Sequence, residues 1–294
     1  MKAEPKGASK GFLALTRLRT GDIADIAENL EKYDAELVLK TGCTLLGVAC
    51  AAAGVDESFV RRVSKDVLVG IVPITSGKGI IAGFSHAVER IVKHIGFSAF
   101  VTESSDVAGL VEAFDKKADV IMLSDDERFV AIHVRSQRVV NNEDATGKGF
   151  VSGLSLMTRS LSNRNVLVVG CGPVGQSATM ALIGLGAVPG VFDVVQRRGY
   201  DLAETIQRSQ SVKIRVENDL NSALTTYRYI IDASPARDII NRFHVRSDTY
   251  ISAPGMPTGL NAGALKKLSG RYLHDPLQIG VATMIVEVTG ESGN

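Results

Sequence analysis

Three glycines follow an apolar segment in "NVLVVGCGPVG", which starts at Asn165, and a helix-like segment comes directly after them. In this arrangement Gly170 allows a tight turn, Gly172 lets the backbone approach a pyrophosphate, and Gly175 lets the helix pack on the strand. A second apolar segment, "GVFDV", places an acidic side chain where it can accept hydrogen bonds from a ribose. The pattern predicts a dinucleotide site made by Gly170, Gly172, Pro173, Val174, Gly175 and Asp193.

Two later apolar strands end in loops with serine and proline residues, in "IIDASPARD" and "YISAPGMPTG". Ligands of open parallel sheets bind at the carboxyl ends of the strands. We therefore expect these loops to border the ribose and nicotinamide, unless they serve only as tight turns into helices. The residues concerned are Ala233, Ser234, Pro235, Ser252 and Pro254.

Polar residues also follow the apolar strands of the first half. In "VGIVPITSGKGIIAGF", Lys78 is followed by Gly79 and no glycine lies five residues before Gly77, so this loop is not a phosphate-binding P-loop. Paired aspartates end "VIMLSDD", where they suit an ammonium group or a solvated turn. No histidine or cysteine spacing accompanies them, so we expect no metal. If the second half holds the dinucleotide, these first-half loops present the substrate.

Hydrophobic periodicity predicts the elements that position these residues. Two or three helices are expected from Asp22 to Ala53, with Thr20 as the first cap and a break at Gly42. Strands and helices then alternate, with a helix over 79–96, a hairpin over 129–140 and a helix over 150–161; alternation restarts at Asn165. The prediction is an α/β fold with two β/α domains: a helical and β/α substrate domain over 1–150, and a Rossmann NAD-binding domain over 151–294.

Composition excludes several classes of protein. The 294 residues carry a net charge of +1 with no run of Lys and Arg, which gives no case for nucleic acid. No apolar window has the roughly 18 residues of a membrane span. The first dozen residues lack the apolar segment of a signal peptide. The three cysteines form no C-x-x-C pair, which favours a reducing, cytoplasmic location.

Several stretches, taken together, resemble the pyrrolysine synthase family, the 3-methylornithyl-N6-lysine dehydrogenases of pyrrolysine biosynthesis. They run in order from about Leu18 to Glu287, and those of the first half are not general Rossmann features. The stretches are "VGIVPITSGKGIIAGFS", "GFSAFVTESSDVAG", "IMLSDDERFVA", "VVNNEDATG", "VLVVGCGPVG", "SAPGMP" and "DPLQIGVATM".

The resemblance implies an amino-acid-dehydrogenase-like architecture and NAD-dependent oxidation of the terminal amine of a lysine-linked methylornithine. Loss of ammonia and condensation with the neighbouring amine would then close the pyrroline ring. It also implies substrate contacts at Leu18, Ser76, Asp126, Asn142 and Asp275. The family has a glutamate where this chain has Asp275, and a glycine where it has Gln278.

The residue types suit this chemistry. Hydride leaves the amine-bearing carbon only when the nitrogen is neutral, so a carboxylate or a water must first accept a proton. We expect Asp126 and Asp275 as catalytic acceptors that also anchor ammonium groups, and Thr75, Ser76, Gly77 and Asn142 as further substrate contacts. The helix over 20–32 is expected to close over the substrate as a lid.

Two alternatives remain open at this stage. One is a shikimate- or methylene-folate-type dehydrogenase, for which Lys78 would be the acting lysine of the first domain. The other is a non-enzymatic NAD(H) sensor. For the enzyme we expect a small-molecule substrate and no nucleic-acid or membrane partner; a homodimer is left open. Asp193 favours NAD over NADP, although Arg197 and Arg198 follow closely.

Overall fold

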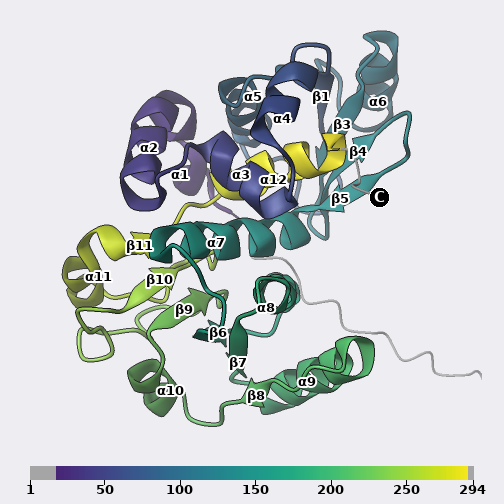
Figure 1. Cartoon of the computed structure of the whole chain (residues 1–294). Helices are drawn as coiled ribbons and strands as arrows, with labels where there is room; N and C mark the ends of the chain where they lie inside the picture. Colours follow the sequence, from purple (N-terminus) through teal and green to yellow (C-terminus); the bar gives the residue numbers. More distant parts are fainter. Residues whose placement is uncertain (1–17, 291–294) are drawn as a thin grey trace, which may run out of the picture.

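The structure is a computed structural model that describes residues 18–290. It contains two α/β bodies separated by one long central helix, α7 (Asn142–Thr158) (Figure 1). The predicted two-domain α/β architecture is confirmed. The first dozen residues lie outside the described part of the chain.

The first body is built on a five-stranded sheet of order β2-β1-β3-β4-β5. Strands β1 to β3 are parallel, whereas β4 runs antiparallel to both of its neighbours, which confirms the predicted hairpin. The strands are β1 (Leu68–Pro73), β2 (Ser98–Val101), β3 (Val120–Ser124), β4 (Phe129–His133) and β5 (Val139–Asn141).

The second body is built on a six-stranded sheet of order β11-β10-β9-β6-β7-β8 in which every pairing is parallel. The chain order reverses next to β6, which is where open parallel sheets bind nucleotides. The strands are β6 (Asn165–Val169), β7 (Val188–Phe192), β8 (Arg215–Val216), β9 (Tyr229–Asp232), β10 (Tyr250–Ser252) and β11 (Tyr272–Leu273).

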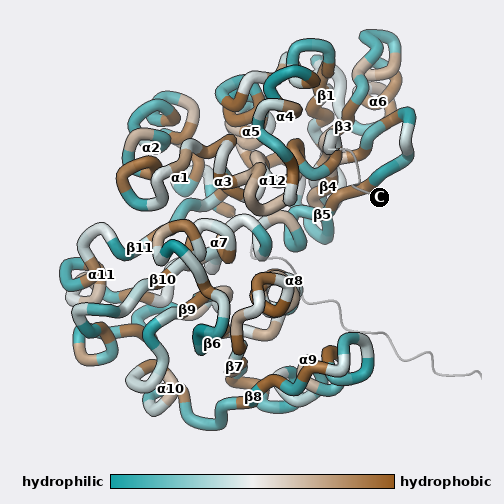
Figure 2. Tube along the Cα trace, viewed as in Figure 1, coloured by the Kyte–Doolittle hydropathy of each residue, from teal (hydrophilic) through white to brown (hydrophobic). Residues whose placement is uncertain are grey.

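Helices cover both sheets, and Figure 2 shows hydrophobic residues concentrated where the elements of each body meet. The first body has α1 (Thr20–Ile23), α2 (Ile26–Thr41), α3 (Leu45–Ala53), α4 (Glu57–Val63), α5 (Phe84–His94) and α6 (Asp106–Asp115). The second has α8 (Pro173–Gly184), α9 (Gln196–Gln210), α10 (Leu220–Thr226), α11 (Ala262–Leu268) and the short 3-10 helix η1 (Ser269–Arg271).

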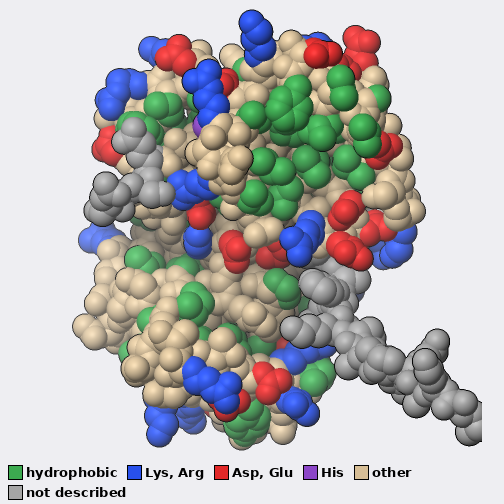
Figure 3. Space-filling model, turned by 90° about the vertical axis from the view of Figure 1, so that its right-hand side faces the viewer, with side chains coloured by type: hydrophobic (Ala, Val, Ile, Leu, Met, Phe, Trp, Pro, Cys, Tyr) green, Lys and Arg blue, Asp and Glu red, His purple; other side chains and the backbone are tan. Residues whose placement is uncertain are grey.

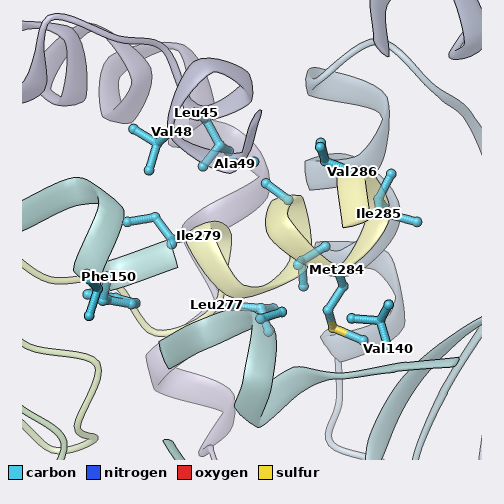
Figure 4. Close-up of a cluster of buried hydrophobic side chains, with 14 of the residues drawn as sticks. Leu45, Val48, Ala49, Val140, Phe150, Leu277, Ile279, Met284, Ile285 and Val286 are labelled. Carbon is cyan, nitrogen blue, oxygen red and sulfur yellow. The ribbon is translucent and has the colours of Figure 1, made fainter. Parts of the chain in front are cut away.

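The last helix, α12 (Gln278–Thr289), does not remain with the second sheet but packs against α3, α5, α7 and β4 of the first body. Its Ile279, Met284 and Val286 lie in one apolar cluster with Val48 of α3 and Phe150 of α7 (Figure 4). The C-terminal segment of the range 151–294 is thus part of the first body. Periodicity predicts an apolar helix but not which sheet it covers.

Three local expectations differ from the structure. Thr20 is the first residue of α1 rather than its cap, which is Arg19. Helix α5 begins at Phe84 and not at Gly79, because Gly79 and Gly83 both adopt positive φ values. Helix α7 begins at Asn142, eight residues before the expected start, so Asn142 lies in its first turn. The break at Gly42 is confirmed, since Gly42 caps α2 in the left-handed conformation.

Hydrophobic side chains are also exposed on the first body, in the upper half of Figure 3. The exposed apolar residues of α6 are Val107, Leu110, Val111 and Phe114. Among the described residues no single helix is long and apolar enough to span a bilayer. Only the bent pair α2 and α3 reaches that threshold, on length and composition.

Candidate active site

A cavity lies between the two bodies, at the carboxyl ends of strands from both sheets. The first body contributes the residues after β1 and β3, and the second contributes the start of α8 and the loops after β9, β10 and β11. Apolar walls are supplied by Ile71, Phe84, Phe129 and Phe150. The cavity therefore brings the predicted substrate face opposite the predicted nucleotide face.

Many of the predicted site residues line this cavity. From the predicted substrate set they are Leu18, Asp126, Asn142 and Asp275, and from the predicted cofactor set Val174, Ala233, Ser234, Pro235 and Pro254. The remaining predicted residues, which are not part of the lining, are Thr75, Ser76, Gly77, Gly170, Gly172, Pro173, Gly175, Asp193 and Ser252.

Backbone geometry explains two of the three glycines in the loop after β6. Gly170 has φ +95°, and a Cβ there would lie 2.9 Å from the carbonyl oxygen of Ala233. A Cβ at Gly175 would collide with the carbonyl oxygen of Gly170. At Gly172, in contrast, no atom lies within 4 Å of the Cβ position, which leaves open space at the N-terminus of α8. An anion fits there, because the first turn of a helix has unpaired N–H groups.

Asp193 lies directly after β7 and beside this loop. It is buried, and its carboxylate accepts hydrogen bonds from the backbone N–H of Cys171 at 2.8 Å and of Val195 at 2.8 Å. Arg198, in the first turn of α9, places its Nη1 3.8 Å from Asp193 Oδ1, whereas Arg197 pairs with Asp201. The acidic residue thus fastens the glycine loop to the end of the next strand.

The loops after β9 and β10 differ in what they offer to the cavity. The hydroxyl of Ser234 donates to Asp232 at 2.8 Å, and Asp232 also accepts the N–H of Gly259 at 2.9 Å. Burial raises the pKa of Asp232, while these hydrogen bonds oppose the rise. Ser252 is fully buried, and its hydroxyl donates to the carbonyl of Phe150, so this side chain fastens β10 to α7 instead of facing the cavity.

The loop after β1 is only partly turned to the cavity. Both Thr75 and Ser76 are exposed. The backbone N–H of Thr75 donates to Asp106 at 2.8 Å, and its hydroxyl donates to the other carboxylate oxygen at 2.5 Å. Asp106 therefore holds Thr75 toward α6. Gly79 and Ile80, further along the same loop, do line the cavity.

Asp126 connects this loop to the end of β3. Its Oδ2 accepts the backbone N–H of Lys78 at 2.6 Å. Gly77, with φ +69°, passes so close that a Cβ there would collide with the Asp126 carboxylate. Gly77 of "TSGKG" is thus required because the backbone there passes close to the carboxylate of Asp126.

Asp275 is the most deeply placed carboxylate of the cavity, at 4% exposure. Its Oδ2 accepts the hydroxyl of Tyr33 at 2.6 Å, and its Oδ1 accepts the N–H groups of Leu277 at 3.0 Å and Ile279 at 3.3 Å. Burial raises the pKa of Asp275, and these hydrogen bonds together with His274 oppose the rise.

Tyr33 and Asp106 were not among the predicted site residues. Tyr33 lies on α2, and its partner is 242 residues away, so no local pattern could have identified it. Asp106 lies at the start of an expected helix, where an acidic residue is ordinary. Among the described residues, no three His, Cys, Asp or Glu side chains gather as a metal site would require.

Comparison with known proteins finds relatives over most of the chain. Residues 22–140 match the family described as "Pyrrolysine biosynthesis protein PylD, N-terminal domain". The chain is 29% identical to the pyrrolysine synthase of Methanosarcina barkeri, over 94% of this chain and 99% of that protein. It is also 29% identical to the pyrrolysine synthase of Methanosarcina acetivorans, over 91% of this chain and 97% of that protein.

Solved structures share the fold at low identity. Quinate dehydrogenase from Corynebacterium glutamicum, in complex with NAD, aligns with a TM-score of 0.52 at 15% identity, over 76% of this chain and 93% of that chain. Shikimate dehydrogenase from Aquifex aeolicus aligns with a TM-score of 0.52 at 15% identity, over 76% of this chain and 92% of that chain. The fold is thus the two-domain Rossmann fold of these dehydrogenases, and the chain is similar to the two pyrrolysine synthases over nearly its whole length.

Proposed function

We propose that this enzyme uses NAD to oxidise the terminal amine of 3-methylornithyl-N6-lysine. In this reaction a C–H bond and an N–H bond of the CH–NH2 group are lost as hydride and proton, which leaves an imine. Water replaces the imine nitrogen, releasing ammonia, and the resulting aldehyde condenses with the neighbouring amine to close the pyrroline ring.

The observation that supports this function best is the composition of the cavity. Three aspartates, Asp125, Asp126 and Asp275, border the same apolar cavity as Val174 and Ser234 of the other body. A substrate with several ammonium groups needs such anions, while apolar walls exclude water from a reactive imine. Relatives named pyrrolysine synthase align with this chain over nearly their whole length, which supports the same assignment.

The proposed roles of Asp126 and Asp275 follow from their surroundings. Asp126, which follows β3 and is partly exposed, is proposed to bind an ammonium group of the arriving substrate. Asp275 is buried, and burial raises its pKa. A carboxylate with a raised pKa is a better proton acceptor, so Asp275 is proposed to take the proton from the reacting amine, directly or through water.

The dinucleotide would be held by the glycine loop and Asp193. When bound, NAD would supply the hydride acceptor. The open space at Gly172 suits a pyrophosphate, and the position of Asp193 suits the adenosine ribose.

Purified protein incubated with NAD and the lysine-linked methylornithine tests the proposal. We expect NADH absorbance to rise together with a product whose mass corresponds to ring closure. Shikimate and quinate, offered in parallel, should give no NADH. Turnover of shikimate without turnover of the methylornithine compound would favour the shikimate-type alternative, and NADH binding without any turnover would favour a sensor.

A further inference from the structure

Tyr33 joins the N-terminal helices to the deepest carboxylate of the cavity. Its hydroxyl donates to Asp275 Oδ2 at 2.6 Å, although Tyr33 lies on α2 and Asp275 lies between β11 and α12. The residues of α2 that fix its place are Ile26, Leu30 and Leu37, all buried in the core of the first body. The position of the hydroxyl is therefore set by the packing of α2.

The other oxygen of Asp275 is also occupied. Its Oδ1 accepts the N–H groups of Leu277 and Ile279, at the start of α12. Backbone groups thus hold one carboxylate oxygen, and the Tyr33 hydroxyl holds the other. Tyr33 is the only side chain that donates a hydrogen bond to Asp275 among the described residues.

We propose that Tyr33 is a positioning residue for the reaction: its hydroxyl holds Asp275 in one orientation, as an ionised carboxylate, at the wall of the cavity. The proposal rests on the proposed function for its catalytic consequence. Its physical part, the link between Tyr33 and the charge of Asp275, is independent of the substrate.

The electrostatics around the pair agree with this arrangement. Burial, the charge of Asp275 and its hydrogen bond, with smaller effects from Asp34 and Glu36 on α2, raise the pKa of Tyr33 well above its usual value, so its hydroxyl stays protonated and donates. Burial raises the pKa of Asp275, and the hydrogen bond from Tyr33 is the largest effect that opposes the rise, followed by the charge of His274. Removing the hydroxyl therefore raises the pKa of Asp275 further.

The test compares Tyr33→Phe with a matched control, Tyr227→Phe. The Tyr227 hydroxyl also donates to a carboxylate, that of Glu217 at 2.7 Å, but this pair lies in the second body and outside the cavity lining. In Tyr33→Phe the acid limb of the pH profile of kcat/KM should move to higher pH, because the hydrogen bond that lowers the pKa of Asp275 is lost. In Tyr227→Phe it should stay in place. An unchanged acid limb in Tyr33→Phe would overturn the catalytic part of the proposal.

Unfolding measured against pH tests the physical part without any substrate. Asp275 has a folded-state pKa above its unfolded value, so its contribution to stability is greatest below about pH 4 and is lost as the pH rises through the folded-state pKa. Removing the Tyr33 hydroxyl raises the folded-state pKa of Asp275 further, which widens the pH range over which this stability is lost. The free energy of unfolding of Tyr33→Phe, relative to the wild type, should therefore fall further between pH 4 and pH 7.

Asp275→Asn provides the second arm of the same experiment, because it removes the titrating group. In this background Tyr33→Phe should cause no pH-dependent change. A deficit that is the same at every pH, or that persists in the Asp275→Asn background, would overturn the proposed link. If the wild-type protein forms no NADH, the proposed function fails, while the unfolding measurement still decides the link.

Discussion

The two walls of the cavity are built on different principles. The wall proposed to face the nucleotide includes Val174, which belongs to a contiguous loop, Gly170 to Gly175, whose glycines are required by backbone geometry. The wall proposed to face the substrate is made by Leu18, Asp126, Asn142 and Asp275, which come from four separate segments. A required backbone conformation appears in the local sequence as glycines. A site made of side chains, in contrast, exists only when distant segments pack together.

The sharpest test of this contrast lies within the glycine loop. Gly175→Ala places a Cβ against the carbonyl oxygen of Gly170, and we expect it to lower the free energy of unfolding by roughly 3 kcal/mol, the upper end for overpacking. Gly172→Ala meets no atom within 4 Å, so stability should be unchanged while NAD affinity falls. Thermal unfolding and NAD titration of both variants measure this. Equal stability losses would contradict the assignment of separate roles.

On the wall proposed to face the substrate, Asp126→Asn should strongly reduce turnover while leaving NAD binding nearly intact. Losing a charged hydrogen bond to an ammonium group costs about 1.5–3 kcal/mol, which is a loss of roughly 10- to 150-fold in kcat/KM. The control is Asp119→Asn, since the Asp119 carboxylate also accepts a backbone N–H, that of Leu68 at 3.0 Å, but does not line the cavity. Unchanged catalytic efficiency in Asp126→Asn would remove this residue from the site.

Cofactor choice tests the role of Asp193. We expect NAD to be preferred over NADP by at least tenfold in kcat/KM, or about 1.4 kcal/mol, because the carboxylate would repel a 2′-phosphate. In Asp193→Ala the ratio should shrink sharply, since Arg198 lies beside the vacated position. The ratio is the correct readout, because loss of the hydrogen bond to Cys171 affects both cofactors. Adding Arg198→Ala to this variant should restore part of the preference for NAD. Equal use of both cofactors by the wild type would refute the placement of Asp193 beside the ribose.

The smallest expected effect concerns the lid. Leu18 lines the cavity, and α1 with the first turns of α2 follows directly. Substrate should slow amide hydrogen exchange over residues 18–32 and leave α9, which does not border the cavity, unchanged. The comparison requires NAD in both samples. Equal exchange in residues 18–32 with and without substrate would count against a lid.

How much the sequence predicts follows the same division. The strand, glycine loop and helix of the second body were predicted nearly to their bounds, because periodicity and glycine positions are local signals. Asn142 directly follows β5, as expected for a polar residue at a strand end, but it also begins α7, which was expected to start at Phe150. The start of α7 depends on its packing against the rest of the fold. Thr75 was expected at the substrate, yet its hydroxyl is bonded to Asp106, a contact that spans 31 residues. Tyr33 could not be predicted at all, because only the folded chain brings it to Asp275.

The position of α12 also determines the order in which the protein can be assembled. Residues 278–289 are synthesised after all six strands of the second sheet, yet they pack into the core of the first body. The second body can complete its sheet while synthesis continues, as domains generally fold as units. The first body must wait with an incomplete core, and with it Asp275 and the hydrogen bonds that orient this carboxylate. The cavity is therefore complete only once α12 has packed, because Asp275, Leu277 and Gly280 line it.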